Sequence, residues 1–141
     1  MNACADLVST AARLAAGSTS SRRFFIDLGA EVGGVGRGPF WFLDAARGGR
    51  NRLRGRGFQS HVDDGTDGQA RHFAGIAAVA ARIGARPTRW FALHVLRDPA
   101  DSADGRLTDH ALDLVRLTRT GEVNRGSVAE WIRTTICEPP R

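Results

Sequence analysis

The feature that most constrains this chain is an apolar stripe at helical spacing between residues 69 and 83. Its members recur every three or four positions, which places them on one face of a helix. They are Phe73, Ile76, Ala77, Ala80 and Ile83. Ala74, Gly75 and Ala78 lie beside the stripe and have little or no side chain, so a second helix can approach closely. We therefore predict a helix over 69–83, ended by Gly84 and packed tightly against a neighbour.

Similar patterns predict further helices before and after this one. Their ranges are 3–16, 40–47, 87–96, one from residue 108 closed by a glycine at 121, and one from residue 127 stopped by prolines at 139 and 140. Thr108 is a predicted N-cap, and Ser127 with Glu130 has the spacing of a capping box. Residues 23–32 fit either a helix or a strand, and we favour a helix.

No segment shows a strand-like alternation of useful length, so the chain is predicted to be mainly α. We expect a compact bundle of about five to six helices with a glycine/arginine-rich loop in the middle. A length of 141 residues fits one domain. Within it, 1–16 is an N-terminal helix, 17–68 a looser region that holds twelve of the 17 glycines, and 69–138 the helical core.

The positive charge is concentrated in one part of the chain. The net charge is +5, all 20 basic residues are arginine, and residues 17–60 alone carry eight arginines against three acids. Within this part, a glycine-rich loop exposes Arg47, Arg50, Arg52, Arg54 and Arg56. A local basic block favours contact with a polyanion, so nucleic acid and acidic protein are the partners we expect. The alternative is a solvated loop without a partner.

The densest polar cluster, residues 61–72, precedes and opens the helix at 69–83. Arg71 is a candidate clamp for a phosphate or carboxylate, and His72 and His61 are candidate catalytic acids or bases. The carboxylates of this cluster are candidate ligands of a divalent cation, the one cofactor that the sequence suggests. They belong to Asp63, Asp64 and Asp67. The competing interpretation is a turn and helix cap without chemistry, since Asp and Gly are typical turn residues.

Two further patterns on predicted helices are weaker. Arg89 and His94 have the Arg-x4-His form used by helical ribonucleases of the HEPN type, but the residues between them are all apolar. We favour a helix with two polar edges for this pair. Asp109, His110 and Asp113 share a helix and are best explained as a solvated face rather than as metal ligands.

Cys4 and Cys137 lie near the two ends and match neither a zinc pattern nor a redox pair. We expect reduced thiols in the cytoplasm; one disulfide is the alternative if the termini meet. No apolar run reaches the roughly 18 residues of a membrane span. The aromatic residues Phe40, Trp41 and Phe42, together with the small-residue face of the helix at 69–83, suggest a homo-oligomer as a further alternative.

The leading functional hypothesis is a small helical protein that binds or acts on a phosphate-rich polymer. In its catalytic form the protein is a nuclease-like hydrolase whose site lies at 61–72. The rival hypothesis is a non-catalytic binding or assembly module that contacts an acidic partner through the basic loop. The decisive geometric question is whether His72, Arg71 and the three aspartates meet at one accessible cavity.

Overall fold

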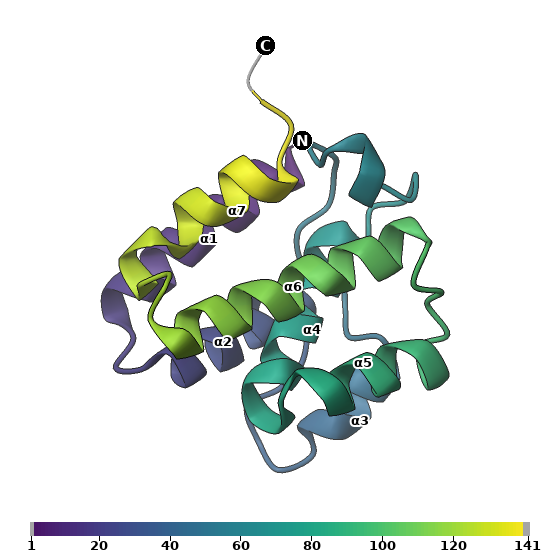
Figure 1. Ribbon diagram of the computed structural model, residues 1–141, viewed down its shortest axis with the longest axis horizontal. Coiled ribbons are helices and arrows are strands. Elements are labelled where there is room, and N and C mark those ends of the chain that lie inside the picture. The colour runs from purple at the N-terminus through teal and green to yellow at the C-terminus, as the bar shows by residue number, and fades with distance from the viewer. Residues whose placement is uncertain (1, 140–141) are drawn as a thin grey trace.

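The computed structural model describes residues 2–139 and confirms a mainly helical protein (Figure 1). Helices account for 67% of it, and the described residues form no strand. The α-helices are α1 (Ala3–Gly17), α2 (Ser21–Leu28), α3 (Trp41–Ala46), α4 (Gln69–Ile83), α5 (Ala85–His94), α6 (Ala103–Thr120) and α7 (Val128–Ile136). Three short turns join them: the π-helical η1 (Gly29–Gly33) and the 3₁₀ turns η2 (Ser60–Val62) and η3 (Arg125–Ser127).

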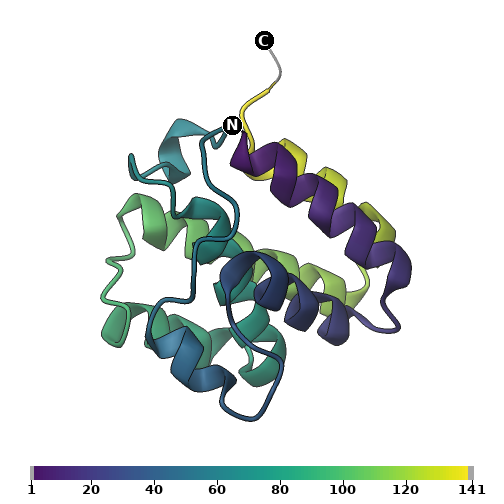
Figure 2. The same ribbon diagram turned by 180° about the vertical axis from the view of Figure 1, so that it is seen from behind.

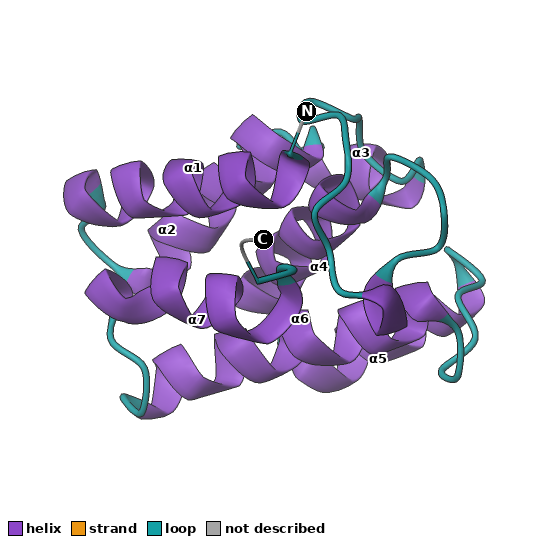
Figure 3. Ribbon diagram, turned by 90° about the horizontal axis from the view of Figure 1, so that it is seen from above, coloured by secondary structure: helices purple, strands orange, loops and turns teal. Residues whose placement is uncertain are grey.

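Helix α4 lies at the centre and begins and ends where its apolar stripe predicts (Figure 3). It packs against α2, η1 and α6, and most of its residues are buried. The small-residue face is covered within the chain: a Cβ added to Gly29 would lie 2.3 Å from the Cβ of Ala78, and one added to Gly33 would lie 2.9 Å from the Gly75 nitrogen. The expected close approach is therefore made within the chain, by η1 and the neighbouring α2.

The two terminal helices α1 and α7 lie side by side, as seen from both sides of the molecule (Figures 1 and 2). A disulfide joins Cys4, in the first turn of α1, to Cys137, the residue that follows α7. The expectation of reduced thiols is wrong, because the antiparallel pairing of α1 and α7 brings the two sulfur atoms together. Phe58 is buried beside this bond, and its segment pairs with Cys137 through an isolated bridge.

Two predicted helix caps are also wrong. Helix α6 starts five residues earlier than predicted, because Ser102 rather than Thr108 caps it by accepting a hydrogen bond from the Gly105 amide. At the start of α7 the Ser127 side chain bonds to Asn124, and Glu130 pairs with Arg133, so the predicted capping box does not form. The earlier start of α6 places Asp104 in its first turn and buries Thr108.

The end of the molecule that carries α3 and α5 is the more open one. Large apolar side chains are exposed there: Phe40, Phe42, Leu43, Ile83, Trp90, Leu93 and Val95. Trp41 is half-buried and packs with Val35, Ala45 and Val79 in a small second core. Within residues 2–139, no helix is both long and apolar enough to cross a membrane.

Candidate functional site

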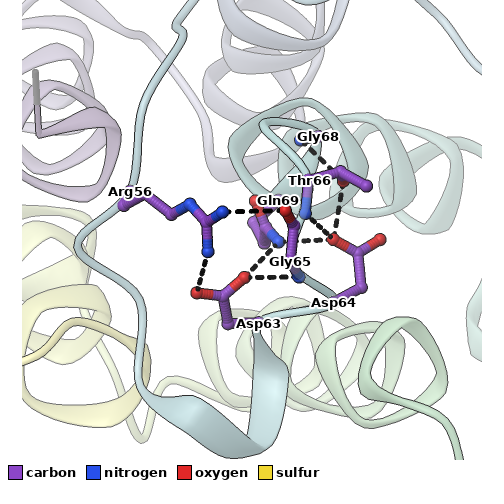
Figure 4. A network of polar contacts seen from close by, with 7 residues as sticks. All are labelled: Arg56, Asp63, Asp64, Gly65, Thr66, Gly68 and Gln69. Atoms are coloured by element: carbon purple, nitrogen blue, oxygen red, sulfur yellow. Dashed lines mark hydrogen bonds and ion pairs between the residues drawn. The ribbon is translucent and has the colours of Figure 1, made fainter.

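The acidic segment before α4 folds into a tight turn (Figure 4). Asp63 Oδ1 accepts from the Gly65 amide at 2.8 Å, and Asp64 Oδ1 accepts from the Thr66 amide at 2.9 Å. The buried Gln69 side chain donates to both carboxylates, at 2.8 and 2.6 Å. Arg56 completes the network by pairing with Asp63 at 3.4 Å and donating to the Gly65 carbonyl at 2.8 Å. This turn holds the first residue of α4 in place.

Asp67 belongs to none of these hydrogen bonds and is exposed to solvent. Among residues 2–139, no three His, Cys, Asp or Glu side chains lie together in a way that would hold a metal ion. The carboxylates of Asp63 and Asp64 are directed to amide and guanidinium groups instead. A cation at Asp63, Asp64 and Asp67 therefore stays a prediction made from the sequence.

A cavity of about 320 Å³ opens beside the first two turns of α4. Its apolar wall is formed by side chains of α3, α4, α5 and the segments that follow η1 and α5. They are Val35, Ala45, Ala46, Ile76, Val79, Phe91, Val95 and Leu96. Its polar wall combines two arginines, one histidine and two aspartates: Arg47, Arg71, His72, Asp98 and Asp104. The volume is in the range of small-molecule sites, and so is the mixture of an apolar wall with a few converging polar groups.

His72 lines this cavity with only 9% of its side chain exposed. Its Nε2 is 2.7 Å from the Thr108 hydroxyl, and its Nδ1 is 3.7 Å from Asp98 Oδ2. Burial lowers the pKa of His72, although the nearby Asp98 carboxylate opposes this shift. Because Thr108 is buried and does not line the cavity, it fixes the ring through Nε2 and leaves the Nδ1 edge to face Asp98.

The two aspartates of the cavity both hold their protons more tightly than an exposed aspartate does. Burial raises the pKa of Asp98, and burial followed by the charge of Asp64 raises the pKa of Asp104. Burial also acts to raise the pKa of Asp64, but hydrogen bonds from Thr66 and Asp104 outweigh it and bring that pKa below its ordinary value. A carboxyl of raised pKa beside a carboxylate of lowered pKa is suited to sharing or moving a proton.

The backbone before Asp98 is in a rare conformation. Arg97 has a φ of 58°, the one positive φ of a non-glycine residue in the described part of the chain. The left-handed conformation costs about 1 kcal/mol or more for such a residue. Here it turns the chain after α5 so that the Asp98 amide donates to the Ala92 carbonyl at 3.0 Å and its carboxyl faces His72.

Arg71 and His72 are the predicted catalytic residues that the structure brings together. His61 lies elsewhere: its Nε2 is 3.1 Å from Nε2 of His110, and its carbonyl accepts from Arg106 at 2.6 Å. The weaker candidates are also occupied, since Arg89 pairs with Asp109 and Asp113 pairs with Arg116. None of them lines the cavity.

The sequence did not single out Asp98, which lies in the loop between α5 and α6, or Asp104, which lies in the first turn of α6. One signal was present for Asp104 alone: an acidic residue in the first turn of a helix is favoured there by the helix dipole. The sequence gives no indication that this loop folds back against the start of α4.

The five arginines of the basic loop do not form one patch. Arg47 lines the cavity, and Arg50 and Arg52 line a second hollow. Arg56 is engaged in the acidic turn. Arg54 is exposed and lines none of these hollows. Three of the five arginines therefore line two separate hollows, and contact with a polyanion stays a prediction.

Comparison with family models, with characterised proteins and with solved structures finds no significant match for this chain. The function must therefore be inferred from the side chains at the cavity and from the charged surface around it.

Proposed function

We propose that this protein is a hydrolase that acts on a phosphate-rich polymer at the cavity beside α4. One observation carries the proposal: Arg71, His72, Asp98 and Asp104 come from three separate parts of the chain and converge on one cavity. Titratable groups with shifted pKa values in a concave site are typical of acid–base catalysis. The convergence supports this class of activity more strongly than the cluster at 61–72 does by itself.

The polar wall provides the groups that hydrolysis of a phosphodiester requires. Arg71 forms none of the salt bridges found in the described chain, and with Arg47 it supplies positive charge for a phosphate oxygen. The apolar wall suits a ring or another apolar group attached to the phosphate. Exposed arginines near the cavity can bind the phosphates of the polymer that lie outside it.

The two aspartates differ in the role that their surroundings favour. Asp98 with His72 accepts a proton from the attacking water as its oxygen bonds to phosphorus. We assign Asp104 the role of general acid, because burial raises its pKa; in this role its carboxyl passes a proton to the leaving oxygen as the phosphorus–oxygen bond breaks. Water returns the proton to Asp104, and the Asp98–His72 pair loses its proton to solvent, so the site is restored.

Replacing Asp98 with Asn tests the proposal directly. Proton transfer by a positioned side chain contributes about 100-fold or more, so hydrolysis is expected to fall by at least about that factor. The measurement is hydrolysis of bis(p-nitrophenyl) phosphate and of labelled RNA and DNA oligonucleotides. Asp101→Asn is the matched control, since Asp101 lies in the same loop, is exposed and does not line the cavity. Unchanged rates in Asp98→Asn, Asp104→Asn and Arg71→Ala would contradict the proposal.

A second candidate function is a non-catalytic module that contacts an acidic partner through the basic loop. The exposure of Arg47, Arg50, Arg52 and Arg54 favours it. On this alternative the folded protein hydrolyses no phosphodiester, and replacing these four arginines with Ala weakens its retention on heparin. Retention that does not change in the quadruple variant would remove this alternative.

A further inference from the structure

A separate concave surface, away from the proposed active site, is lined by four arginines and no acid. This hollow of about 420 Å³ lies between α2, the segment before α3 and the end of α4. Its arginines are Arg22, Arg23, Arg37 and Arg82. Its other lining residues are apolar or glycine and include Trp41. Four cations around one hollow are an unusual arrangement, because like charges repel.

Arg82 is held in place before any ligand arrives. Its guanidinium donates to the Gly36 carbonyl at 3.0 Å and to the Ala78 carbonyl at 3.4 Å. Its Cζ also lies 4.7 Å from the centre of the Trp41 ring, within cation–π range. Burial lowers the pKa of Arg82, and the charges of Arg22 and Arg23 lower it further. Within the described residues no carboxylate pairs with Arg82, so an anion in the hollow would relieve its repulsion from Arg22 and Arg23.

The protein supplies little negative charge to this surface. Asp27 pairs with both Arg37 at 2.8 Å and Arg23 at 3.4 Å, so one carboxylate is shared by two cations. Arg22 and Arg82 form no salt bridge within residues 2–139. Glu31 also lies 4.0 Å from Arg37 and pairs with Arg13 as well, so the four arginines of the hollow face two shared carboxylates and keep a net positive charge.

A second hollow of about 340 Å³ adjoins the first, because Arg37 lines both. It adds Arg50 and Arg52, and the carboxylate that lines it, Asp44, accepts a hydrogen bond from the Gly36 amide at 2.9 Å. We call the two hollows together the arginine groove. Its members are Arg22, Arg23, Arg37, Arg50, Arg52 and Arg82.

We propose that the arginine groove binds the phosphate backbone of a single-stranded nucleic acid. Guanidinium groups bind phosphates bidentately, and a row of them suits a ligand with repeated phosphates. Phe40 is 67% exposed and Phe42 is 48% exposed beside Trp41, where their rings can stack on bases. Stacking surfaces favour a nucleic acid over an acidic peptide. The inference takes its substrate class from the proposed function and names the surface that holds the polymer.

The test measures binding of a fluorescent oligothymidylate by anisotropy at several salt concentrations. Arg22 and Arg52 are exposed and make no side-chain hydrogen bond or salt bridge in the described chain, so the double variant Arg22→Ala/Arg52→Ala is expected to fold. Loss of two charged contacts should weaken binding at least about tenfold. The slope of log affinity against log salt should fall by about 1.4, from about 0.7 for each lost contact on a single strand.

The matched control is Arg133→Ala, which removes one arginine from α7, a helix that contributes to neither hollow. It should leave oligothymidylate affinity unchanged. Equal affinity and equal salt slope in the double variant and the unaltered protein would overturn the proposal. So would a double variant that loses binding to vesicles of anionic phospholipid while it keeps the oligonucleotide, because the groove would then hold lipid headgroups.

Hydrolysis of bis(p-nitrophenyl) phosphate separates this proposal from the proposed function. That small substrate does not need the groove, so the double variant should hydrolyse it at the normal rate. Asp98→Asn should show the reverse, with normal oligothymidylate binding and impaired hydrolysis. If the folded protein hydrolyses nothing while the groove variants still lose the oligonucleotide, the hydrolase is wrong and the groove is supported.

Discussion

The two ends of the molecule are built in opposite ways. At the end formed by α1 and α7, the facing side chains are apolar and fully buried, and a disulfide joins the helices. At the end formed by α3 and α5, helix α3 buries only Ala45, aromatic rings are exposed, and arginines surround the hollows. Helix α4 runs through the centre and connects the two ends.

This contrast indicates that the disulfide-linked apolar end and the cavity that we propose as the active site lie in different parts of the molecule. Buried polar groups such as His72, Asp98 and Thr108 are expensive to fold around unless they have partners. Burial of apolar side chains at the closed end offsets this free-energy cost. The open end contains a cavity, a residue with a left-handed backbone conformation (Arg97) and carboxyls of raised pKa.

The largest effect is expected from breaking the disulfide. Cys4→Ala removes a bond between residues 133 apart in sequence. In the chain-entropy model, constraint of so long a loop is worth about 5 kcal/mol in the free energy of unfolding. Urea unfolding measures the loss, with chemical reduction of the unaltered protein as a parallel experiment. Under conditions where the variant is still folded, it should keep the hydrolysis of bis(p-nitrophenyl) phosphate that we propose for the cavity. Loss of that hydrolysis in the folded variant would show that the cavity depends on the disulfide.

A matched pair of leucines sharpens the comparison. Leu7 on α1 is 0% exposed and Leu43 on α3 is 44% exposed. Leu7→Ala should lower the free energy of unfolding by about 2–5 kcal/mol, because it leaves a void in the core. Leu43→Ala should lower it by less than about 1 kcal/mol. Thermal or urea unfolding of both variants decides the matter, and equal losses would contradict the division into a closed and an open end.

A smaller effect concerns the pH dependence of stability at the open end. The folded pKa of His72 lies below its ordinary value of 6.5, so its contribution to stability is present above pH 6.5 and is lost as the pH falls through the folded pKa. Asp98 and Asp104 act in the opposite sense, since a raised folded pKa gives stability that is lost as the pH rises above the ordinary value of 3.8.

His72→Asn should therefore lose less stability than the unaltered protein when the pH falls from about 7.5 to about 5.5. Urea unfolding at both pH values measures the difference. His94→Asn is the control, because His94 is exposed and should leave the pH dependence as it is. If both variants keep the same pH dependence, the lowered pKa of the buried His72 ring is contradicted.

The helices were largely predictable because periodicity acts locally. The predicted range of α4 matches the structure, and the N-terminal helix differs by one residue at its end. Helix α6 was misjudged at its start, since Pro99 and Gly105 suggest a loop while Ser102 supplies the cap that allows the helix to begin. A polar residue can cap a helix only if its side chain is free to bond to the backbone. Contacts with residues distant in sequence determine which side chain is free.

The candidate site was predictable only in part, for a similar reason. Arg71 and His72 lie in the first turn of the clearest helix, so their placement follows from the sequence pattern. Asp98 reaches them through a turn in the backbone at Arg97 that no local pattern predicts. Of the arginine groove, the sequence singled out Arg50 and Arg52 but not the other members, because Arg22, Arg37 and Arg82 are distant in sequence and meet only after folding.

The bond between Cys4 and Cys137 closes nearly the whole described chain into a covalent ring. Disulfides persist in oxidising compartments, which is at odds with the predicted cytoplasmic location, and a thiol count on freshly isolated protein would decide between them. A ring of this kind cannot be drawn end-first through a narrow pore as a single strand. Unfolding motors and translocation channels would have to wait until the bond is reduced, so the surrounding redox potential determines when the protein can be threaded and when it must travel folded.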